Sequence, residues 1–290
     1  MRYSIIILIF SVNIYSQEIV EKDSLWTKRG NVTVLLNQTG FSDWVGGGTN
    51  NFSATIKFDY EWEYKDKGWD WLTNVESAFG IAKYKNAPFA RKIDDRILIQ
   101  SIVGKEFTRN LSFSAFFNFT SQIGNGYKYK KDSNNNEIRE LTTKLLSPAY
   151  FQLGSGFLWK KDEKIWVNYS PIASRLILVS KKFTDDLLEN ETYFGVSQNK
   201  SSRYELGANL TFHSEGKLLE NVNYKQDLKL FSNYIEEASN IDLDYLAQIE
   251  INVNPLLTTQ LIFQLIYDDN AVSRLQVREV FGVGVQLKLN

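Results

Sequence analysis

The stretch Phe281-Gly282-Val283-Gly284-Val285-Gln286-Leu287-Lys288-Leu289-Asn290 ends the chain and decides the fold class. Its odd positions are apolar and its even positions are small or polar. A period of two predicts a β-strand with one apolar and one polar face. At the edge of a soluble sheet such a face would promote aggregation, whereas the closing strand of a barrel in lipid requires it. We therefore expect a closing strand that turns these side chains toward lipid: Phe281, Val283, Val285, Leu287 and Leu289.

The same alternation recurs along most of the chain. The clear segments are 52–62, 69–81, 111–119, 151–159, 204–212, 241–251 and 257–267, and the weaker ones are 31–37, 93–107, 164–180 and 222–233. With the terminal strand they predict about twelve strands, each long enough to cross a bilayer when tilted. A soluble sandwich would show the same alternation. The lengths of the connections and the positions of the tryptophans therefore have to distinguish the two folds.

Short and long connections alternate along the chain. Short turns are expected at 65–68, 108–110, 161–164 and 252–255, and longer polar connections at 38–50, 84–92, 124–148, 181–202, 234–239 and 269–276, with 214–221 of intermediate length. This pattern is typical of periplasmic turns and extracellular loops. We therefore expect an all-β fold, a transmembrane antiparallel β-barrel of about 12 strands over residues 31–290.

Five of the seven tryptophans border the predicted periplasmic turns. Aromatic side chains gather at membrane–water interfaces, where one end of the ring is apolar and the other is wet. A soluble core would scatter them along the strands. We therefore expect an interfacial girdle made of Trp62, Trp69, Trp71, Trp159 and Trp166.

The N-terminus predicts export to the outer membrane of a Gram-negative bacterium. Arg2, the apolar run 5–10 and Ser16 resemble a secretory signal peptide over residues 1–16, followed by a polar periplasmic arm at 17–30. The chain has no cysteine, which excludes disulfides, thiolate metal sites and a lipoprotein anchor. Its net charge of −1 gives no basic stripe for nucleic acid. The expected partner is outer-membrane lipid.

No catalytic, cofactor or metal site stands out in the sequence. His213 is the only histidine and precedes Ser214, but adjacent strand residues face opposite sides, so we expect a structural histidine. The acid pairs Asp94-Asp95, Asp185-Asp186 and Asp268-Asp269 lack the spacing of a calcium loop and are expected to be solvated.

The rows that face the lumen carry charges of both signs. We expect Asp70, Asn74, Glu76, Asn209, Asp242, Asp244, Gln248, Glu250, Gln264 and Lys288 in this lining. In a barrel of this size, side chains and loops fill much of the interior. A mixed-sign lining therefore favours a packed polar interior with internal ion pairs over a selective pore.

Several segments resemble a family of Bacteroidota outer-membrane barrels known only as a domain of unknown function. Segment 41–50 is similar to that family's NWxxGGxN motif, and 91–95 to its RKxDD motif; 121–127, 146–150, 230–234 and 266–269 follow in consistent order. Asp43 and Ser121 stand where Asn and Thr are usual. The resemblance implies a barrel without an assigned reaction. The position of the first two motifs in loops indicates a structured extracellular cap with Trp44, Gly46, Gly47, Gly48, Arg91, Asp94 and Asp95, fastened by pairing of Arg91 or Lys92 with Asp94 or Asp95.

Three functions follow as hypotheses. The first is a non-enzymatic accessory or interaction subunit of a cell-envelope complex, in contact with other outer-membrane or periplasmic proteins. It rests on the lack of a catalytic constellation, the filled lumen and the polar loops at 124–148 and 181–202. The second is a passive channel or transporter for a small solute. The third is an envelope lipid hydrolase that uses His213.

Overall fold

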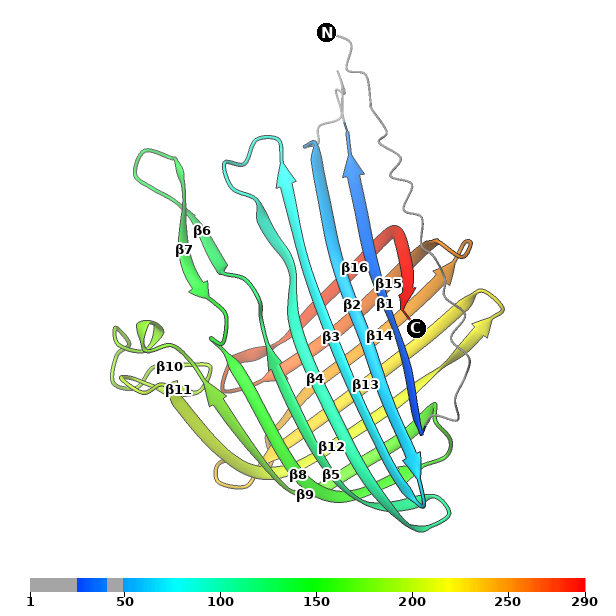
Figure 1. Cartoon of the computed structure of the whole chain (residues 1–290). Coiled ribbons are helices and arrows are strands. Elements are labelled where there is room, and N and C mark those ends of the chain that lie inside the picture. The colour runs from blue at the N-terminus through cyan, green and yellow to red at the C-terminus, as the bar shows by residue number, and fades with distance from the viewer. Residues whose placement is uncertain (1–24, 41–48, 290) are drawn as a thin grey trace.

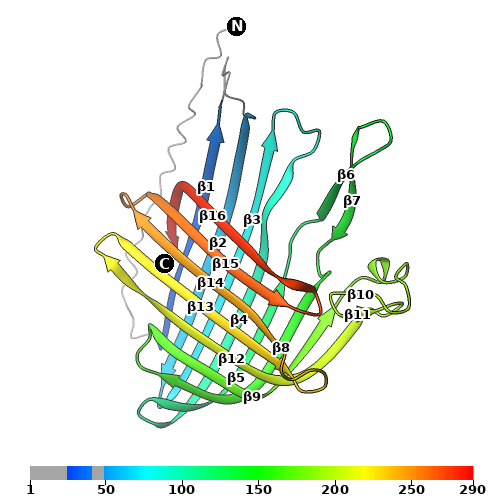
Figure 2. The ribbon, with the colours of Figure 1, turned by 180° about the vertical axis from the view of Figure 1, so that it is seen from behind.

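The chain forms a closed antiparallel β-barrel (Figures 1 and 2). The structure is a computed structural model and describes residues 25–40 and 49–289. Twelve strands make up the barrel: β1 (Trp26–Thr39), β2 (Asn51–Asp66), β3 (Trp69–Tyr84), β4 (Arg91–Thr108), β5 (Leu111–Ser121), β8 (Ala149–Lys160), β9 (Ile165–Leu178), β12 (Ser202–Leu219), β13 (Val222–Asn233), β14 (Ile241–Asn252), β15 (Leu257–Asp268) and β16 (Val272–Leu289). The predicted all-β, twelve-strand barrel is confirmed. The described residues contain no helix with the length and hydropathy needed to cross a membrane.

The barrel closes between its first and last strands. β1 pairs with β16 in antiparallel register from Gly30 opposite Leu289 to Leu36 opposite Val283. Every other neighbour follows the order of the barrel strands along the chain, so short connections suffice. The prediction that the terminal strand closes the barrel is confirmed.

Two small sheets extend from one end of the barrel. β6 (Gly126–Lys131) and β7 (Glu137–Thr143) form a hairpin between β5 and β8. The segment between β9 and β12 contains the 3₁₀ helix η1 (Lys181–Phe183) and the short strands β10 (Thr192–Tyr193) and β11 (Val196–Ser197). Both lie at the end opposite the β2–β3 turn (Figures 1 and 2). Long loops of outer-membrane barrels are typically extracellular, so we refer to this end as the extracellular end and to the other as the periplasmic end.

The barrel is polar inside and apolar outside. On the outer face, Phe113, Leu153 and Phe281 are 56%, 60% and 62% exposed. Buried polar side chains line the inner face, among them Thr33, Glu76, Asn168, Glu205 and Thr211. This inverted polarity is typical of a transmembrane barrel.

The closing strand β16 shows this polarity residue by residue. In the predicted lipid-facing row, Phe281, Val283, Val285 and Leu287 are exposed and Leu289 is partly exposed. Gly282, Gly284 and Gln286, which stand between Phe281 and Leu287, are buried, whereas Lys288 at the end of the strand is exposed. The alternation in exposure thus follows the alternation in the sequence.

Strand boundaries differ from the prediction at three places. β1 begins at Trp26, so residues 26–30 belong to the barrel and not to a periplasmic arm at 17–30. They pair with the end of β2, from Trp26 opposite Tyr64, and Arg29 reaches the lumen. Residues 214–219 continue β12, and β16 begins at Val272, because polar residues on inward rows continue a strand as well as apolar ones do. The predicted signal peptide, 1–16, lies outside the described residues.

Part of the interior is apolar. Ile102, Phe116, Leu158, Trp166, Ala173 and Phe231 form one buried cluster inside the wall made by β4, β5, β8, β9 and β13. Trp166 is 4% exposed and stacks on His213, with ring centroids 5.1 Å apart. The prediction that Trp166 belongs to the interfacial girdle is therefore wrong, because its row in β9, with Asn168 and Ser170, faces inward.

The other predicted girdle residues lie on the outer face. Trp69, Trp71 and Trp159 are 48%, 43% and 41% exposed, and Trp62 packs on Tyr60 with ring centroids 4.5 Å apart. Trp26 joins them, with its ring 5.7 Å from that of Trp71. Trp26 was not predicted in the girdle, because residues 17–30 were assigned to the arm.

Candidate functional site

A layer of charged side chains crosses the lumen. Glu76 on β3 and Lys225 on β13 form an ion pair, with Lys225 Nζ 2.6 Å from Glu76 Oε1. These two strands are six positions apart in the ring of twelve, which is half-way round the barrel. The other oxygen of Glu76 accepts a hydrogen bond from Arg96 of β4 at 2.9 Å. One carboxylate thus joins opposite walls of the barrel.

Lys57 of β2 adds a second crossing through amide groups. Its ammonium donates to Gln260 Oε1 of β15 at 2.9 Å and to Gln248 Oε1 of β14 at 3.2 Å. Gln260 then donates to Glu250 at 3.1 Å, and Gln286 donates to the same carboxylate at 2.8 Å. Since Lys57 is buried, its charge is compensated inside the barrel by these amide oxygens and by the nearby carboxylates of Asp59 and Glu76.

A third crossing lies closer to the extracellular end. Arg278 of β16 pairs with Asp94 of β4, four positions away in the ring, and donates from Nε to Gln264 at 3.2 Å. Gln264 donates in turn to Asp244 at 2.8 Å. The prediction that Asp94 is solvated in the extracellular cap is wrong, because Asp94 occupies an inward position of β4 and is buried on the inner wall.

We call these three crossings the ion layer, which comprises Lys57, Glu76, Asp94, Arg96, Lys225, Glu250 and Arg278 together with the bridging glutamines Gln248, Gln260, Gln264 and Gln286. Glu76, Glu250, Gln248 and Gln264 belong to the predicted lumen lining, whereas Asp94, Gln260 and Gln286 do not. The four cations were not predicted. Lys57 stands between Thr55 and Asp59 on the inward row of β2, so the alternation of this strand predicts that Lys57 faces the lumen. Its partners were not predictable, since they come from strands that are distant in sequence.

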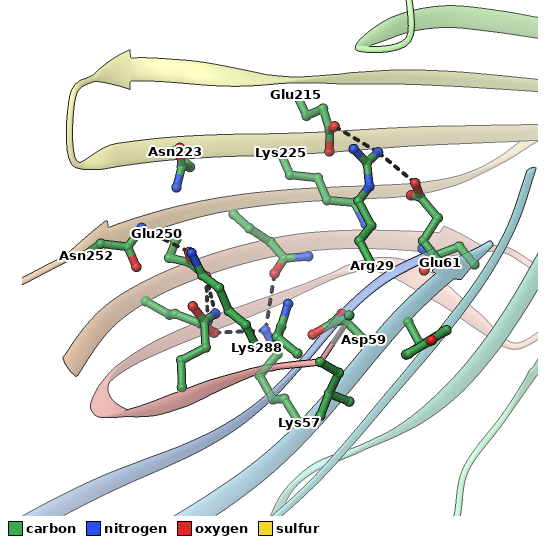
Figure 3. Close-up of a pocket in the computed structure, with 18 of the residues that line it drawn as sticks. Arg29, Lys57, Asp59, Glu61, Glu215, Asn223, Lys225, Glu250, Asn252 and Lys288 are labelled. Carbon is green, nitrogen blue, oxygen red and sulfur yellow. Dashed lines mark hydrogen bonds and ion pairs between the residues drawn. The ribbon is translucent and has the colours of Figure 1, made fainter. Parts of the chain in front are cut away.

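The ion layer separates two cavities. The inner cavity, of about 620 Å³, lies on the periplasmic side and is lined by charged and amide side chains of β1–β3 and β12–β16 (Figure 3). In it Arg29 bridges Glu61 at 2.7 Å and Glu215 at 3.5 Å. Lys288, expected in the lumen lining, also lines this cavity. The outer cavity, of about 280 Å³, lies between the extracellular parts of β5, β8 and β13–β15.

The remaining predicted lining residues also face inward. Asp70 pairs with Lys160 of β8, and Asn74 donates to Glu76 at 2.9 Å. Asp242 of β14 pairs with Arg175 of β9, three positions away. Asn209 is 1% exposed and accepts a hydrogen bond from Thr211. The Asp70–Lys160 and Asp242–Arg175 pairs link further strands through the lumen.

The 91–95 segment connects the barrel to the extracellular hairpin. Lys92 Nζ lies 2.6 Å from Asp95 Oδ2. Asp95 also accepts the backbone N–H groups of Ile123 at 2.7 Å and Gly124 at 3.1 Å. Arg91 pairs with Glu137 of β7 and stacks over the Tyr129 ring at 3.4 Å, so its partner is not Asp94 or Asp95. Trp44, Gly46, Gly47 and Gly48 of the predicted cap lie outside the described residues.

The β10–β11 segment folds against the barrel mouth. Val196 is fully buried against Ile177 and Val179, and the Tyr193 ring stacks on Phe183 with centroids 4.9 Å apart. The Tyr193 hydroxyl donates to the Thr142 carbonyl, which joins this segment to the end of β7. Burial raises the pKa of Tyr193 above its ordinary value, so the hydroxyl keeps its proton in alkaline solution as well as at neutral pH.

His213 is held in a structural setting. Its Nδ1 lies 2.7 Å from Asp227 Oδ1 and its Nε2 lies 3.8 Å from Glu215. Ser214 hydrogen bonds to the Tyr224 hydroxyl at 3.1 Å and points to the opposite side of the strand. The arrangement orients an imidazole but provides no hydroxyl beside it among the described residues.

The acid pair at the end of β15 is joined by a third carboxylate. Oxygens of Asp242, Asp268 and Asp269 lie within 4.8 Å of one another. Arg175 pairs with Asp242, two backbone N–H groups donate to Asp268, and Asn240 donates to Asp269 at 2.8 Å. The three carboxylates thus have protein donors of their own. The pair at 185–186 is exposed on the segment that follows η1, as expected.

Comparisons with known proteins assign no activity to the chain. The model of a family described as "Protein of unknown function (DUF3078)" matches residues 36–127, which run from β1 to the start of β6. No curated protein matches the chain. The translocator domain of the autotransporter NalP from Neisseria meningitidis aligns with a TM-score of 0.41 and 9% identity over 90% of this chain and 87% of that one. The β-domain of the Bordetella autotransporter BrkA gives 0.36 and 8% over 89% and 98%, and OmpT, an outer membrane protein of Vibrio cholerae, gives 0.29 and 8% over 94% and 100%.

Proposed function

We propose that the protein is a non-conducting outer-membrane β-barrel that serves as an accessory or interaction subunit of a cell-envelope complex. The observation that carries this proposal is the ion layer, above all the Glu76–Lys225 pair that joins opposite walls of the lumen at 2.6 Å. In an open pore, solvent separates the charged side chains of opposite walls. Here an acid and a base from opposite walls form an ion pair inside the lumen. The apolar outer face and the aromatic girdle support location in the outer membrane.

The extracellular side offers the surface for such a role. The β6–β7 hairpin is fastened to β4 by the Arg91–Glu137 pair and by the contact of Arg91 with Tyr129. Arg139 of the same hairpin lies over Phe89 at 4.9 Å and over Tyr127 at 4.5 Å. A hairpin ordered in this way presents a fixed surface, which lowers the entropic cost of binding a partner.

Purification of the tagged protein from native outer membranes after mild cross-linking tests this role. The matched variant replaces residues 127–142 by a short turn and leaves all barrel strands intact. We expect a defined partner with the wild type and its loss in the trimmed variant. Recovery of the wild type alone at every detergent strength would contradict the proposal.

A passive channel is the second candidate, because a cavity approaches the ion layer from each end. Conduction would require the layer to open, so conductance of the refolded protein separates the two functions. A lipid hydrolase that uses His213 receives no such support, since Ser214 faces away from the imidazole. The hydrolase hypothesis would require that the wild type hydrolyse short-chain esters and that a His213→Ala variant lose this activity.

A further inference from the structure

The outer cavity has an apolar wall built from three barrel strands and the β10–β11 segment. Tyr150 of β8, Phe231 of β13 and Ile266 of β15 line it from the barrel, and Phe194 lines it from the β10–β11 segment. Arg175 holds the Phe231 ring in place, with its guanidinium carbon 4.1 Å from the ring centroid. The volume of about 280 Å³ accommodates a small molecule rather than a polymer.

Lys229 supplies an unpaired cation to this cavity. Its register partner on β14 is Asp244, which lines the same cavity and accepts a hydrogen bond from Gln264 at 2.8 Å. Among the described residues, Lys229 takes part in no ion pair or hydrogen bond, unlike Lys57 and Lys225 of the ion layer. Since an ammonium inside a barrel is costly without a partner, this group is suited to hold a carboxylate that enters the cavity.

Asn118 supplies an unpaired acceptor to the same cavity. The side chain is 4% exposed and donates from Nδ2 to Gln152 Oε1 at 3.3 Å. Its carbonyl oxygen Oδ1 is buried without a partner in the described part of the chain. Buried amide oxygens are nearly always hydrogen bonded, so this one calls for a donor from outside the protein.

We propose that the outer cavity binds a small zwitterion with an apolar side group, that is, a molecule of the amino-acid class. The carboxylate of the ligand pairs with the Lys229 ammonium, and its amine donates to Asn118 Oδ1. The apolar group packs against Phe194, Phe231 and Tyr150. The nearby Asp242 and Asp244 keep the cavity from being cationic overall, which favours a zwitterion over a simple anion. Binding requires no opening of the ion layer and is independent of the role in a complex.

Calorimetric titration of the refolded barrel in nanodiscs tests this site. Four probes separate its parts: L-phenylalanine, 3-phenylpropionate without the amine, 2-phenylethylamine without the carboxylate, and glycine without the apolar group. We expect saturable binding of L-phenylalanine and at least ten-fold weaker binding of each other probe. Absence of saturable L-phenylalanine binding, or equal affinity for 3-phenylpropionate, would overturn the assignment.

Variants then assign the contacts. Lys229→Met should weaken the binding of L-phenylalanine at least ten-fold and leave the binding of 2-phenylethylamine unchanged. Asn118→Leu should weaken the binding of both probes. Lys288→Met is the matched control, because Lys288 lines the inner cavity and should not affect any probe. Phe194 lies outside the barrel strands, so Phe194→Asp should weaken the binding of L-phenylalanine without affecting assembly. Wild-type affinity in either Lys229→Met or Phe194→Asp would contradict the proposal.

Discussion

Lys225 on β13 donates to the Glu76 carboxylate on β3 at 2.6 Å, and these two strands stand opposite each other in the ring of twelve. The side chain of Glu76 is 5% exposed and that of Lys225 is 27% exposed. With Arg96 bound to its other oxygen, Glu76 compensates two cations at once. This carboxylate is therefore the centre of the ion layer, and removal of its charge should have consequences for both stability and closure.

Glu76→Gln should destabilise the barrel by about 3–5 kcal/mol, the usual cost of removing one partner from a buried ion pair. The variant removes the carboxylate that bridges Lys225 and Arg96. Urea unfolding in lipid vesicles, followed by gel mobility, measures the loss. Glu140→Gln is the control, since its pair with Lys130 lies on the exposed hairpin and should leave the midpoint unchanged. Equal midpoints for all three proteins would show that the layer contributes nothing.

Val283→Arg should impair assembly, because it places a cation on the lipid face at a cost of about 2–4 kcal/mol near the bilayer centre. Gln286→Arg, further along the same strand, faces the inner cavity and Glu250, and should assemble close to wild type. Gly284 is unsuitable as the inward control, since a Cβ there would lie 2.0 Å from the Val34 carbonyl oxygen. Membrane insertion in vivo measures the difference, and equal insertion of both variants would contradict the outward row of β16.

Barrel closure can be tested by disulfide formation, since the chain has no cysteine of its own. Val34 and Val285 face each other across the β1–β16 seam, so the pair Val34→Cys and Val285→Cys should cross-link on oxidation. The displaced control combines Val34→Cys with Phe281→Cys, because Phe281 lies on the same outer face of β16 but beyond the reach of a disulfide at this register. Equal cross-linking of the two pairs, read by gel mobility, would mean that the seam has another register.

Trp166 should be shielded from lipid. In lipids with brominated chains, a variant that retains only Trp71 should lose most of its fluorescence, because Trp71 is 43% exposed on the outer face. A variant that retains only Trp166 should keep its fluorescence, because that ring is 4% exposed and packs on His213 inside the barrel. Strong quenching of Trp166 fluorescence would show that this ring contacts lipid and belongs to the girdle after all.

The fold was predictable from the sequence because a strand that faces lipid on one side and a polar interior on the other alternates strictly. The same parity places Trp166 on the inward row of β9, although its position beside a turn indicated the girdle. Beyond Pro171 the register shifts on both sides of β9, so that Ala173 and Arg175 face inward at odd positions. Strict alternation could not predict that Arg175 faces inward. The register shift depends on a bulge at Pro171, which has no backbone N–H.

The acids and amides of the lumen were predictable as a lining, but their partners were not. Glu76 and Lys225 are 149 residues apart, and their contact depends on strand number and on which strands stand opposite each other in the closed barrel. Asp94 shows the same difficulty on a smaller scale. Its neighbour Asp95 binds the loop after β5, whereas Asp94 faces the lumen and Arg278, because adjacent strand residues point to opposite sides.

The conductance of single refolded barrels in a planar bilayer tests the central claim most directly. The wild type should show no steps above background in concentrated KCl, because the ion layer closes the lumen. A Glu76→Ala, Lys225→Ala double variant that still assembles should show steps, since it removes the ion pair that joins opposite walls of the lumen. Stable, stepwise conductance of the wild type would contradict the account.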